Sequence, residues 1–485
     1  MFELYHRPAA AELLETQPEP PPATAPTLRD RLKAWAGGIG IGHLVLVVFA
    51  LHLFALSFPS VTSGGQGLVF DETYYVTASL DLLHGVANNL EHPFFGKLWG
   101  ALGIAIFGDN FFGWRIFYAV IGTLSVWLMY ELARVFFTKE KALLAASMLA
   151  FENLFFVHTS LLLLDGPPVL FALAGYLAYF KRRYYVSALL FGLCILSKED
   201  GLFFVLALVL YHLWAHGSSV IRRVEPLGLK KILVFALILT LVVSVPLWGY
   251  DAAYHPYSKT TILDETVVSI DPLTNFTVTS TTTKTLQSYP VTEPAQNFIF
   301  YFTYQNSLKG CGSVNTWNCY PWNWILPFNV SPLPYYVSDN TVTKTTTTCP
   351  STDVCAHSIT TTILHPVDWQ GIGNLVVWYS IWLIVPLVAW RLLTRKAQPV
   401  DALVASVIAG TYLPWFYISL VSQRVEYAFY LINTDVGLAL GIPLVVTYLA
   451  RGRIGAERLL TLTWVAAAIV FFLYYFPVNP FAFTS

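Results

Sequence analysis

Charged residues are scarce in this chain. Asp, Glu, Lys and Arg make up 12% of its 485 residues, whereas 55% of the residues are hydrophobic. Soluble globular domains carry roughly a quarter charged residues, so a water-soluble fold is excluded and lipid is the expected surrounding solvent. The net charge of −1 provides no basic excess, which excludes nucleic acid as a principal partner.

The amino-terminal region lacks the pattern of a cleaved secretory signal, which is a basic patch followed by a short apolar core. Residues 1–36 are polar and contain a proline-rich stretch from Pro18 to Pro26. This composition predicts a disordered cytoplasmic tail. The first apolar segment is then expected to be an uncleaved membrane anchor.

Long apolar runs predict an all-α polytopic membrane protein with about 11 transmembrane helices, since roughly 17–25 apolar residues cross a bilayer. The runs define an N-terminal transmembrane module at 37–249, with a first external loop at 59–110, and a C-terminal transmembrane module at 373–485. The segment 250–372 between them is expected to form an external Ser/Thr-rich loop domain with β structure. The predicted spans lie near 38–58, 111–133, 142–160, 166–180, 184–197, 201–215, 231–249, 374–391, 401–421, 427–449 and 459–476.

Basic residues give the orientation of these spans. When the N-terminus is placed in the cytoplasm, most of the 28 Lys and Arg residues fall in cytoplasmic segments, as expected for a multi-pass protein. The loop domain and the first loop are then external. Basic residues on that side run against the bias, and binding of an anion would explain them. They are Lys97, Arg115, Lys198, Lys259, Lys284, Lys309, Lys344 and Arg424.

Cysteines are few, and all but Cys194 lie in the loop domain. Four cysteines in an oxidising compartment predict two disulfides. Of the three possible pairings, the simplest is Cys311–Cys319 with Cys349–Cys355. A zinc site is the alternative, but His357 and His365 of the loop lack a metal-binding spacing, and no metal is expected.

The first external loop contains the adjacent acids Asp71 and Glu72, followed by Tyr74. A carboxylate in a desolvated site at the membrane surface has a raised pKa and can act as a general base. The alternative is a helix N-cap with an acid in the first turn. Spacing alone favours the cap.

Three further residues of this region carry polar or charged side chains at the expected membrane surface. His92 and Lys97 precede a short apolar stretch that cannot span the bilayer and is expected to lie along the interface. Arg115 opens the second span, where it could pair with Asp71, Glu72 or a phosphate. Snorkelling of Lys97 and Arg115 to the interface is the alternative.

Two acids belong to the third span and its outer end. Asp165 precedes two prolines, a pattern that favours helix capping. Glu152 is expected inside the same helix, where a carboxylate is costly and needs a partner.

Arg424 lies in a brief external turn between two predicted spans and is followed by aromatic residues. A guanidinium near the interface, facing a cavity, is well shaped for bidentate binding of phosphate. Pairing with Glu426 is the alternative.

In their order and their predicted side of the membrane, these residues resemble the dolichyl-phosphate-mannose–protein O-mannosyltransferase family, a group of GT-C membrane glycosyltransferases. The similarity covers roughly 40–215 and 365–450. The matching residues are Asp71-Glu72 with Tyr74, His92-Pro93 with Gly96-Lys97, Trp114-Arg115, Leu164-Asp165, Ser197-Lys198 with Gly201-Leu202, Gly373-Asn374 through Trp378, Leu413-Pro414-Trp415, and Arg424.

The resemblance implies an inverting glycosyltransferase that moves a sugar, mannose by family, from a polyprenyl- or dolichyl-phosphate donor to Ser or Thr hydroxyls of proteins. Asp71, with Glu72, would provide the base, and Arg424, with Lys97 or Arg115, would hold the donor phosphate. The remaining motif residues would line the substrate pocket: His92, Tyr74, Asp165, Glu152, Asn374 and Trp378. No cofactor is implied, because the lipid-linked sugar phosphate is itself the donor and already carries a good leaving group.

The chain departs from the family pattern at three positions. Phe94 stands where a second proline is usual, Ser160 where an arginine is frequent, and Glu152 where aspartate is more usual. The segment 250–372 is too short for the β-trefoil module of eukaryotic members. An archaeal or bacterial cell membrane is therefore expected rather than the endoplasmic reticulum.

Two other functions fit parts of the pattern. A related GT-C enzyme could transfer the sugar to a lipid or glycan. A transporter would instead need charges near the bilayer midplane and inverted repeats, but the unusual charges cluster at the predicted outer face.

Overall fold

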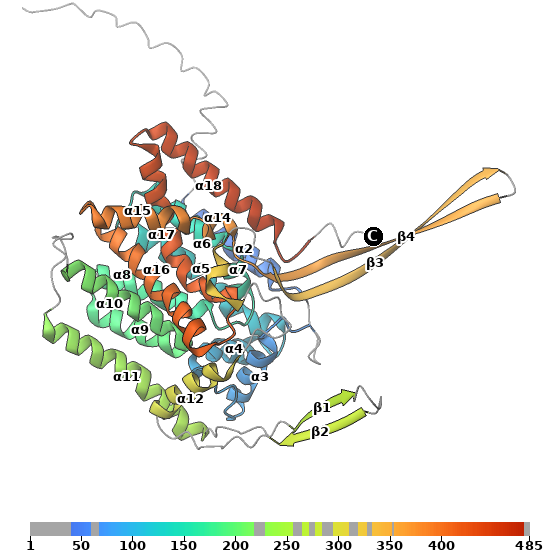
Figure 1. The fold of residues 1–485 in the computed structure, drawn as a ribbon, viewed down its shortest axis with the longest axis horizontal. Coiled ribbons are helices and arrows are strands. Elements are labelled where there is room, and N and C mark those ends of the chain that lie inside the picture. Colours follow the sequence, from blue (N-terminus) through green and yellow to red (C-terminus); the bar gives the residue numbers. More distant parts are fainter. Residues whose placement is uncertain are drawn as a thin grey trace, which may run out of the picture. The chain divides into compact units, whose positions relative to one another are not determined.

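The computed structural model describes residues 40–59, 67–217, 228–255, 264–270, 277–283, 294–309, 319–326, 332–351 and 354–479. Helices dominate these residues, as the apolar runs predict, and the fold class is confirmed (Figure 1). The N-terminal half contains α2 (Ile41–Ala55), α3 (Glu72–Leu83), α4 (Phe94–Phe107), α5 (Phe111–Ala133), α6 (Lys139–Ala150), α7 (Asn153–Ser160), α8 (Gly166–Phe180), α9 (Tyr184–Ser197), η1 (Glu199–Gly201), α10 (Leu202–Gly217) and α11 (Leu229–Tyr254).

The second half alternates strands and helices before returning to long helices. Its elements are β1 (Asp264–Ile270), β2 (Thr277–Thr283), α12 (Pro294–Ser307), α13 (Pro321–Trp324), β3 (Leu333–Ser351), β4 (Val354–Gly371), α14 (Leu375–Trp378), α15 (Ile381–Leu393), α16 (Pro399–Tyr417), η3 (Ile418–Ser422), η4 (Ala428–Leu431), α17 (Ile432–Ala450) and α18 (Ile454–Tyr474).

Each predicted span is occupied by helix. Within the described ranges, six helical segments are long and apolar enough to cross a membrane, and the bent pair α6–α7 can form a seventh span. Other apolar helices, including α2, α8 and α9, are shorter than 18 residues. A multi-pass architecture is therefore supported, while the count of about 11 crossings stays a prediction.

The third predicted span is not one continuous helix, and the placement of Glu152 in its interior was wrong. The chain bends by 63° between α6 and α7. Glu152 lies at the break, where its side chain accepts a hydrogen bond from the amide of Phe155 and caps α7. The buried carboxylate thus satisfies a free backbone donor at a new helix start.

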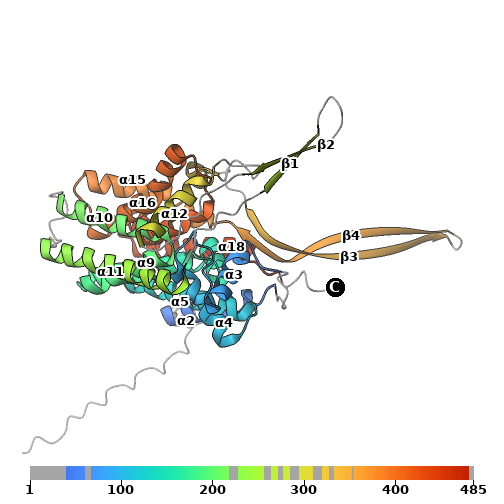
Figure 2. The same ribbon diagram turned by 90° about the horizontal axis from the view of Figure 1, so that it is seen from below.

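Helix α17 forms the buried centre of the bundle. It packs against α16, α6 and α18, and an 18-residue stretch of the span Ala428–Ala450 is wholly buried, although Tyr448 and Leu449 near its end are exposed. In contrast, α11 and α18 expose most of their apolar residues, as expected for helices that contact lipid. Figure 2 shows α9, α10 and α11 side by side, and α16 packs closely on α10.

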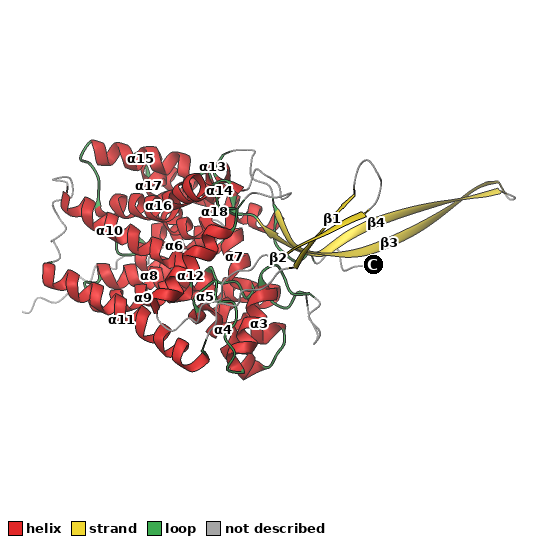
Figure 3. Ribbon diagram, turned by 60° about the horizontal axis from the view of Figure 1, so that its bottom comes forward, coloured by secondary structure: helices red, strands yellow, loops and turns green. Residues whose placement is uncertain are grey.

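The predicted β structure of 250–372 is present as two antiparallel hairpins, β1–β2 and β3–β4 (Figure 3). The second is long, and its base is anchored among the helices. Tyr335 of β3 is buried, and Trp369 of β4 donates from its indole nitrogen to the carbonyl of Phe58, 3.1 Å away. Contacts between β4 and α7 complete this anchor.

Candidate active site

The Asp71 carboxylate stands at the start of α3 without a hydrogen-bond partner among the described residues. It makes no side-chain cap on α3, so the capping alternative is not what the structure shows. Burial raises the pKa of Asp71, and the neighbouring Lys198 partly offsets this effect. The carboxylate is therefore both unoccupied and more basic than usual, as a general base requires.

Glu72 is engaged differently from Asp71. Its two carboxylate oxygens accept from Nε and Nη2 of Arg115 at 2.7 and 2.6 Å, and both side chains are fully buried. Glu72 also accepts from the amides of Val69 and Leu162, each at 3.0 Å. This pair fixes the loop that carries Asp71. The predicted roles of Glu72 as a base and of Arg115 as a phosphate ligand would each require this pair to open.

Asp165 belongs to a buried polar network. It begins α8 without capping it, so the capping interpretation was wrong. Its carboxylate accepts from Nζ of Lys198 at 2.5 Å and lies 2.7 Å from Nδ1 of His158. Burial alone would raise the pKa of Asp165, but Lys198 and His158 hold it below its usual range.

The network continues to the external hairpin. The hydroxyl of Tyr335 lies 2.9 Å from Nε2 of His158, and the Tyr335 ring stacks on Phe70 with ring centroids 4.0 Å apart. Phe70 directly precedes Asp71. A residue of the 250–372 segment therefore completes the surroundings of the first-loop acid.

The charged triplet Lys198, Glu199 and Asp200 also belongs to this candidate site. The sequence analysis predicts no role for Glu199 or Asp200 and names Lys198 only as an external cation within a family motif. Burial would lower the pKa of Lys198, but Asp165 and Asp200 raise it, so the side chain is a permanent cation. Glu199 lies 2.8 Å from Nδ1 of His92, which orients that ring. Three consecutive charges between two apolar runs were the available signal. Glu199 and Asp200 only separate the predicted spans, whereas anion binding is the reason given for Lys198 on the external side.

Arg424 and His92 line one cavity of about 330 Å³ together with Lys198, although they come from distant segments. Nη2 of Arg424 donates to Tyr430 at 2.7 Å and to Gln305, whereas its Nε and Nη1 are buried without a hydrogen-bond partner among the described residues. Unpaired buried donors on a guanidinium are costly. They indicate a ligand that supplies acceptor oxygens.

The alternative partner of Arg424 does not satisfy these donors. Glu426 forms no ion pair with Arg424 in the described part of the chain, and both of its carboxylate oxygens lack hydrogen-bond partners. Burial raises the pKa of Glu426 to about 8, with Arg424 acting in the opposite direction. A carboxyl group that is largely neutral at pH 7 leaves Arg424 its positive charge for an anion.

Lys97 and Tyr74 do not line the cavity. Lys97 is 1% exposed and donates to backbone carbonyls between α3 and α4, including those of Asn89 and His92. Burial lowers the pKa of Lys97 to about 7. Tyr74 is 62% exposed, whereas its buried neighbour Tyr75 packs edge-on against His92.

The remaining predicted pocket residues form a separate buried cluster. The amide of Asn374 donates to Glu152 at 2.6 Å, and its side chain donates to the carbonyls of Phe151 and Ala468. Trp378 is buried beside this cluster, at the end of α14. These contacts join α7, α14 and α18 and place Asn374, Glu152 and Trp378 outside the lining of the 330 Å³ cavity.

The disulfide prediction concerns residues that the structure describes only in part. Cys311 lies outside the described residues. Cys349 and Cys355 stand on β3 and β4 beside the register pair Thr348–Ala356, and their side chains lie outside what the structure describes. Both disulfides stay predictions. Within the described ranges no three His, Cys, Asp or Glu side chains gather as a metal site, and independence from metal also stays a prediction.

Comparison with known proteins finds protein mannosyltransferases. A family model described as dolichyl-phosphate-mannose-protein mannosyltransferase matches residues 91–248. A polyprenol-phosphate-mannose–protein mannosyltransferase of Mycobacterium tuberculosis is 26% identical, over 93% of this chain and 89% of the relative.

Solved structures share the fold at low sequence identity. The Saccharomyces cerevisiae protein O-mannosyltransferase Pmt1–Pmt2 complex, bound to the sugar donor, matches with a TM-score of 0.61 and 14% identity, over 94% of this chain and 90% of the matched chain. ArnT from Cupriavidus metallidurans, bound to undecaprenyl phosphate, matches with a TM-score of 0.51 and 13% identity, over 92% and 76%.

The chain thus shares the fold of these membrane glycosyltransferases. The matched family model and the similar relatives confirm the resemblance drawn from the motifs, which is to the dolichyl-phosphate-mannose–protein mannosyltransferases, and they support a glycosyltransferase activity.

Proposed function

We propose that this chain transfers mannose from a polyprenyl- or dolichyl-phosphate donor to Ser or Thr hydroxyls of proteins, with inversion at the sugar. The observation that carries the proposal is the pairing of an unoccupied, raised-pKa carboxylate at Asp71 with the cations Lys198 and Arg424 at an adjoining cavity. A base and a phosphate site are the two parts that this reaction needs. The named activity of the similar relatives supports the same choice of sugar and acceptor.

The donor phosphate would bind between Lys198 and Arg424, with the free donors Nε and Nη1 of Arg424 turned to its oxygens. Leu202 and Tyr417 line the same cavity and are 40% and 66% exposed on α10 and α16. The polyprenyl chain would leave the cavity over these residues toward lipid. One cavity thus offers an anion site and an apolar exit.

In the reaction, Asp71 takes the proton of the acceptor hydroxyl as the oxygen attacks the anomeric carbon. The new oxygen–carbon bond forms on the face opposite the bond that breaks, and the lipid phosphate leaves with the electron pair. Lys198 and Arg424 stabilise the negative charge that develops on this phosphate, and they do so most strongly in a water-poor site. The site would lie on the external face of an archaeal or bacterial cell membrane.

Replacement of Asp71 by Asn tests the base. The isosteric amide cannot accept the proton, so we expect kcat for mannosyl transfer to a Thr-containing peptide to fall by about 10²–10⁴-fold, with donor binding retained. Asp109→Asn is the matched control, because Asp109 is an exposed acid at the far end of the same loop. Full activity of Asp71→Asn would exclude Asp71 as the base.

The acceptor is tested separately. Purified protein with labelled donor is offered Ser/Thr peptides or a lipid extract in parallel. Label in the peptide and not in the lipid is the expected result. Label in the lipid alone would support a related GT-C enzyme with a lipid or glycan acceptor.

A further inference from the structure

A second cavity, of about 650 Å³, lies at the opposite end of the helix bundle from Asp71. Helix α5 connects the two ends, since Arg115 near its start pairs with Glu72 and Val135 just beyond its end lines the second cavity. Twenty residues of helix separate them by about 30 Å at 1.5 Å per residue, the thickness of a hydrocarbon core. The cavity therefore lies at the other membrane interface.

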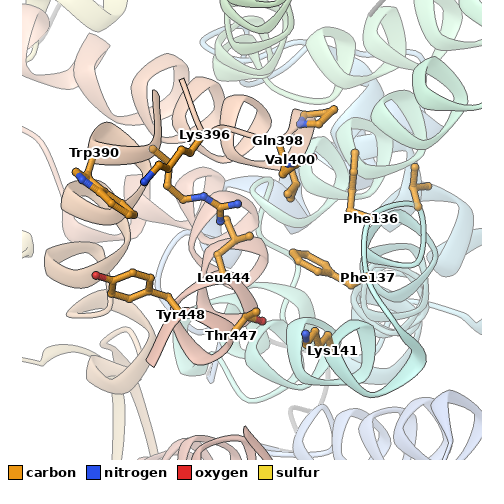
Figure 4. A pocket seen from close by; sticks show the side chains of 13 residues that line it. Phe136, Phe137, Lys141, Trp390, Lys396, Gln398, Val400, Leu444, Thr447 and Tyr448 are labelled. Atoms are coloured by element: carbon orange, nitrogen blue, oxygen red, sulfur yellow. The ribbon is translucent and has the colours of Figure 1, made fainter. Parts of the chain in front are cut away.

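The walls of this cavity combine apolar surface with basic groups (Figure 4). The labelled side chains of Phe136, Phe137 and Leu444 stand around its open centre, with Trp390 and Tyr448 at one side. Trp and Tyr at a span end are typical of the headgroup region. The three basic lining residues are Lys141, Arg391 and Lys396.

These cations exceed the acids that face them. Arg391 pairs through Nη1 with the buried Asp401 at 3.1 Å, and Lys141 pairs with Glu457 at 3.2 Å. Lys396 has an aromatic partner instead, because its Nζ lies over the Trp390 ring, 5.1 Å from the centroid. Three cations and two carboxylates leave a positive excess beside an apolar cavity.

We propose that this cavity holds the phosphate group of a membrane lipid, with the lipid's hydrocarbon chains against the aromatic wall. Basic pockets between transmembrane helices at one interface are suited to anionic headgroups. Lys396 and Lys141 would contact the phosphate, and Arg391 would share its remaining donors with it. The donor cavity and this second site would thus bind lipid phosphate at opposite membrane interfaces.

The test measures lipid binding to the purified full-length protein by native mass spectrometry, with dioleoylphosphatidylglycerol, polyprenyl phosphate and inorganic phosphate as separate probes. The variant is Lys141→Gln/Lys396→Gln, and the matched control is Lys139→Gln/Arg395→Gln, which removes two exposed charges from the same end outside the cavity. We expect the first double variant to weaken binding of at least one lipid phosphate tenfold or more, and the control to change it less than threefold.

The two lipid probes show which lipid source fits the site. Equal losses in both double variants would indicate general attraction to a basic surface and overturn the proposal, as would undiminished lipid binding in the cavity variant. Binding of inorganic phosphate without either lipid would overturn its lipid part. Thermal midpoints in neutral phosphatidylcholine check that both variants are folded.

Discussion

At the scale of single residues, Arg424 is the side chain assigned most directly to binding the donor phosphate. Its guanidinium is held on one side by Tyr430 and Gln305, while Nε and Nη1 are buried and unpaired. Tyr430 also lies beneath Lys198, whose Nζ is 5.4 Å from the ring centroid. One aromatic ring therefore supports both cations that are assigned to the donor phosphate.

Replacement of Arg424 by Ala should raise KM for the lipid-phosphate donor by about 10–100-fold, because hydrogen bonds to charged groups contribute about 1.5–3 kcal/mol. Arg424→Lys keeps the charge but loses the planar fork, so an intermediate KM is expected. Donor titrations at saturating acceptor measure both values, with exposed Arg458→Ala as the control. An unchanged donor dependence in Arg424→Ala would remove its phosphate role.

The sequence identified the two ends of this site better than its middle. Asp71 was predicted through the family resemblance, since spacing alone favours a helix cap, and Arg424 because a guanidinium in a short external turn is suited to phosphate. Lys198 was named as an external cation but was not assigned to the site, and His158 was missed, because their contacts arise only when α7, α8 and η1 come together in the fold. Tyr335 was missed for the same reason.

At the scale of elements, the β3–β4 hairpin contributes to the site from outside the two transmembrane modules. The base of the hairpin places Tyr335 against both Phe70 and His158. Gly371 faces the Tyr335 ring, where a Cβ atom would stand 2.5 Å from ring atoms. The hairpin thus positions groups that surround Asp71 and Asp165.

Replacement of Tyr335 by Phe keeps the ring stack but removes the hydroxyl from His158. We expect kcat to fall by about 3–10-fold, which corresponds to the loss of one net hydrogen bond of about 0.5–1.5 kcal/mol, with KM for donor and acceptor unchanged. The half-buried neighbour offers the control Tyr336→Phe. Steady-state kinetics of both variants measure these values. An equal fall of kcat in the two variants, or a change of KM alone in Tyr335→Phe, would contradict this role.

The helix break between α6 and α7 could not be predicted from the hydrophobic pattern of the sequence. The apolar run 142–160 gives little sign of a bend, because only Glu152 and Asn153 interrupt it at that point. The break follows from a tertiary partner, since the second carboxylate oxygen accepts from the amide of Asn374, more than 200 residues away in the chain. Thr-rich composition indicated β structure in 250–372, but the register of its hairpins depends on pairing that composition does not specify.

At the scale of the whole molecule, the two cavities divide the chain into a reaction end and a basic end. Lys141, Arg391 and Lys396 gather at the end that the distribution of basic residues assigns to the cytoplasm. The predicted orientation therefore places Asp71 and the cavity of Arg424 outside the cell.

Cysteine labelling tests this orientation. His84→Cys lies after α3 at the reaction end, and Arg395→Cys lies after α15 at the basic end, both at exposed positions. A membrane-impermeant maleimide should label the first in intact cells and the second only after permeabilisation, with the unsubstituted chain as the control. The reverse pattern would invert the topology.

The ion pair of Glu72 and Arg115 has a consequence for how catalysis begins. The pair ties the Asp71 loop to α5 and to the chain between α7 and α8, so the position of the base is set by contacts within the protein. Arrival of the sugar donor then need not order the Asp71 loop, and its binding energy remains available for orienting the anomeric carbon.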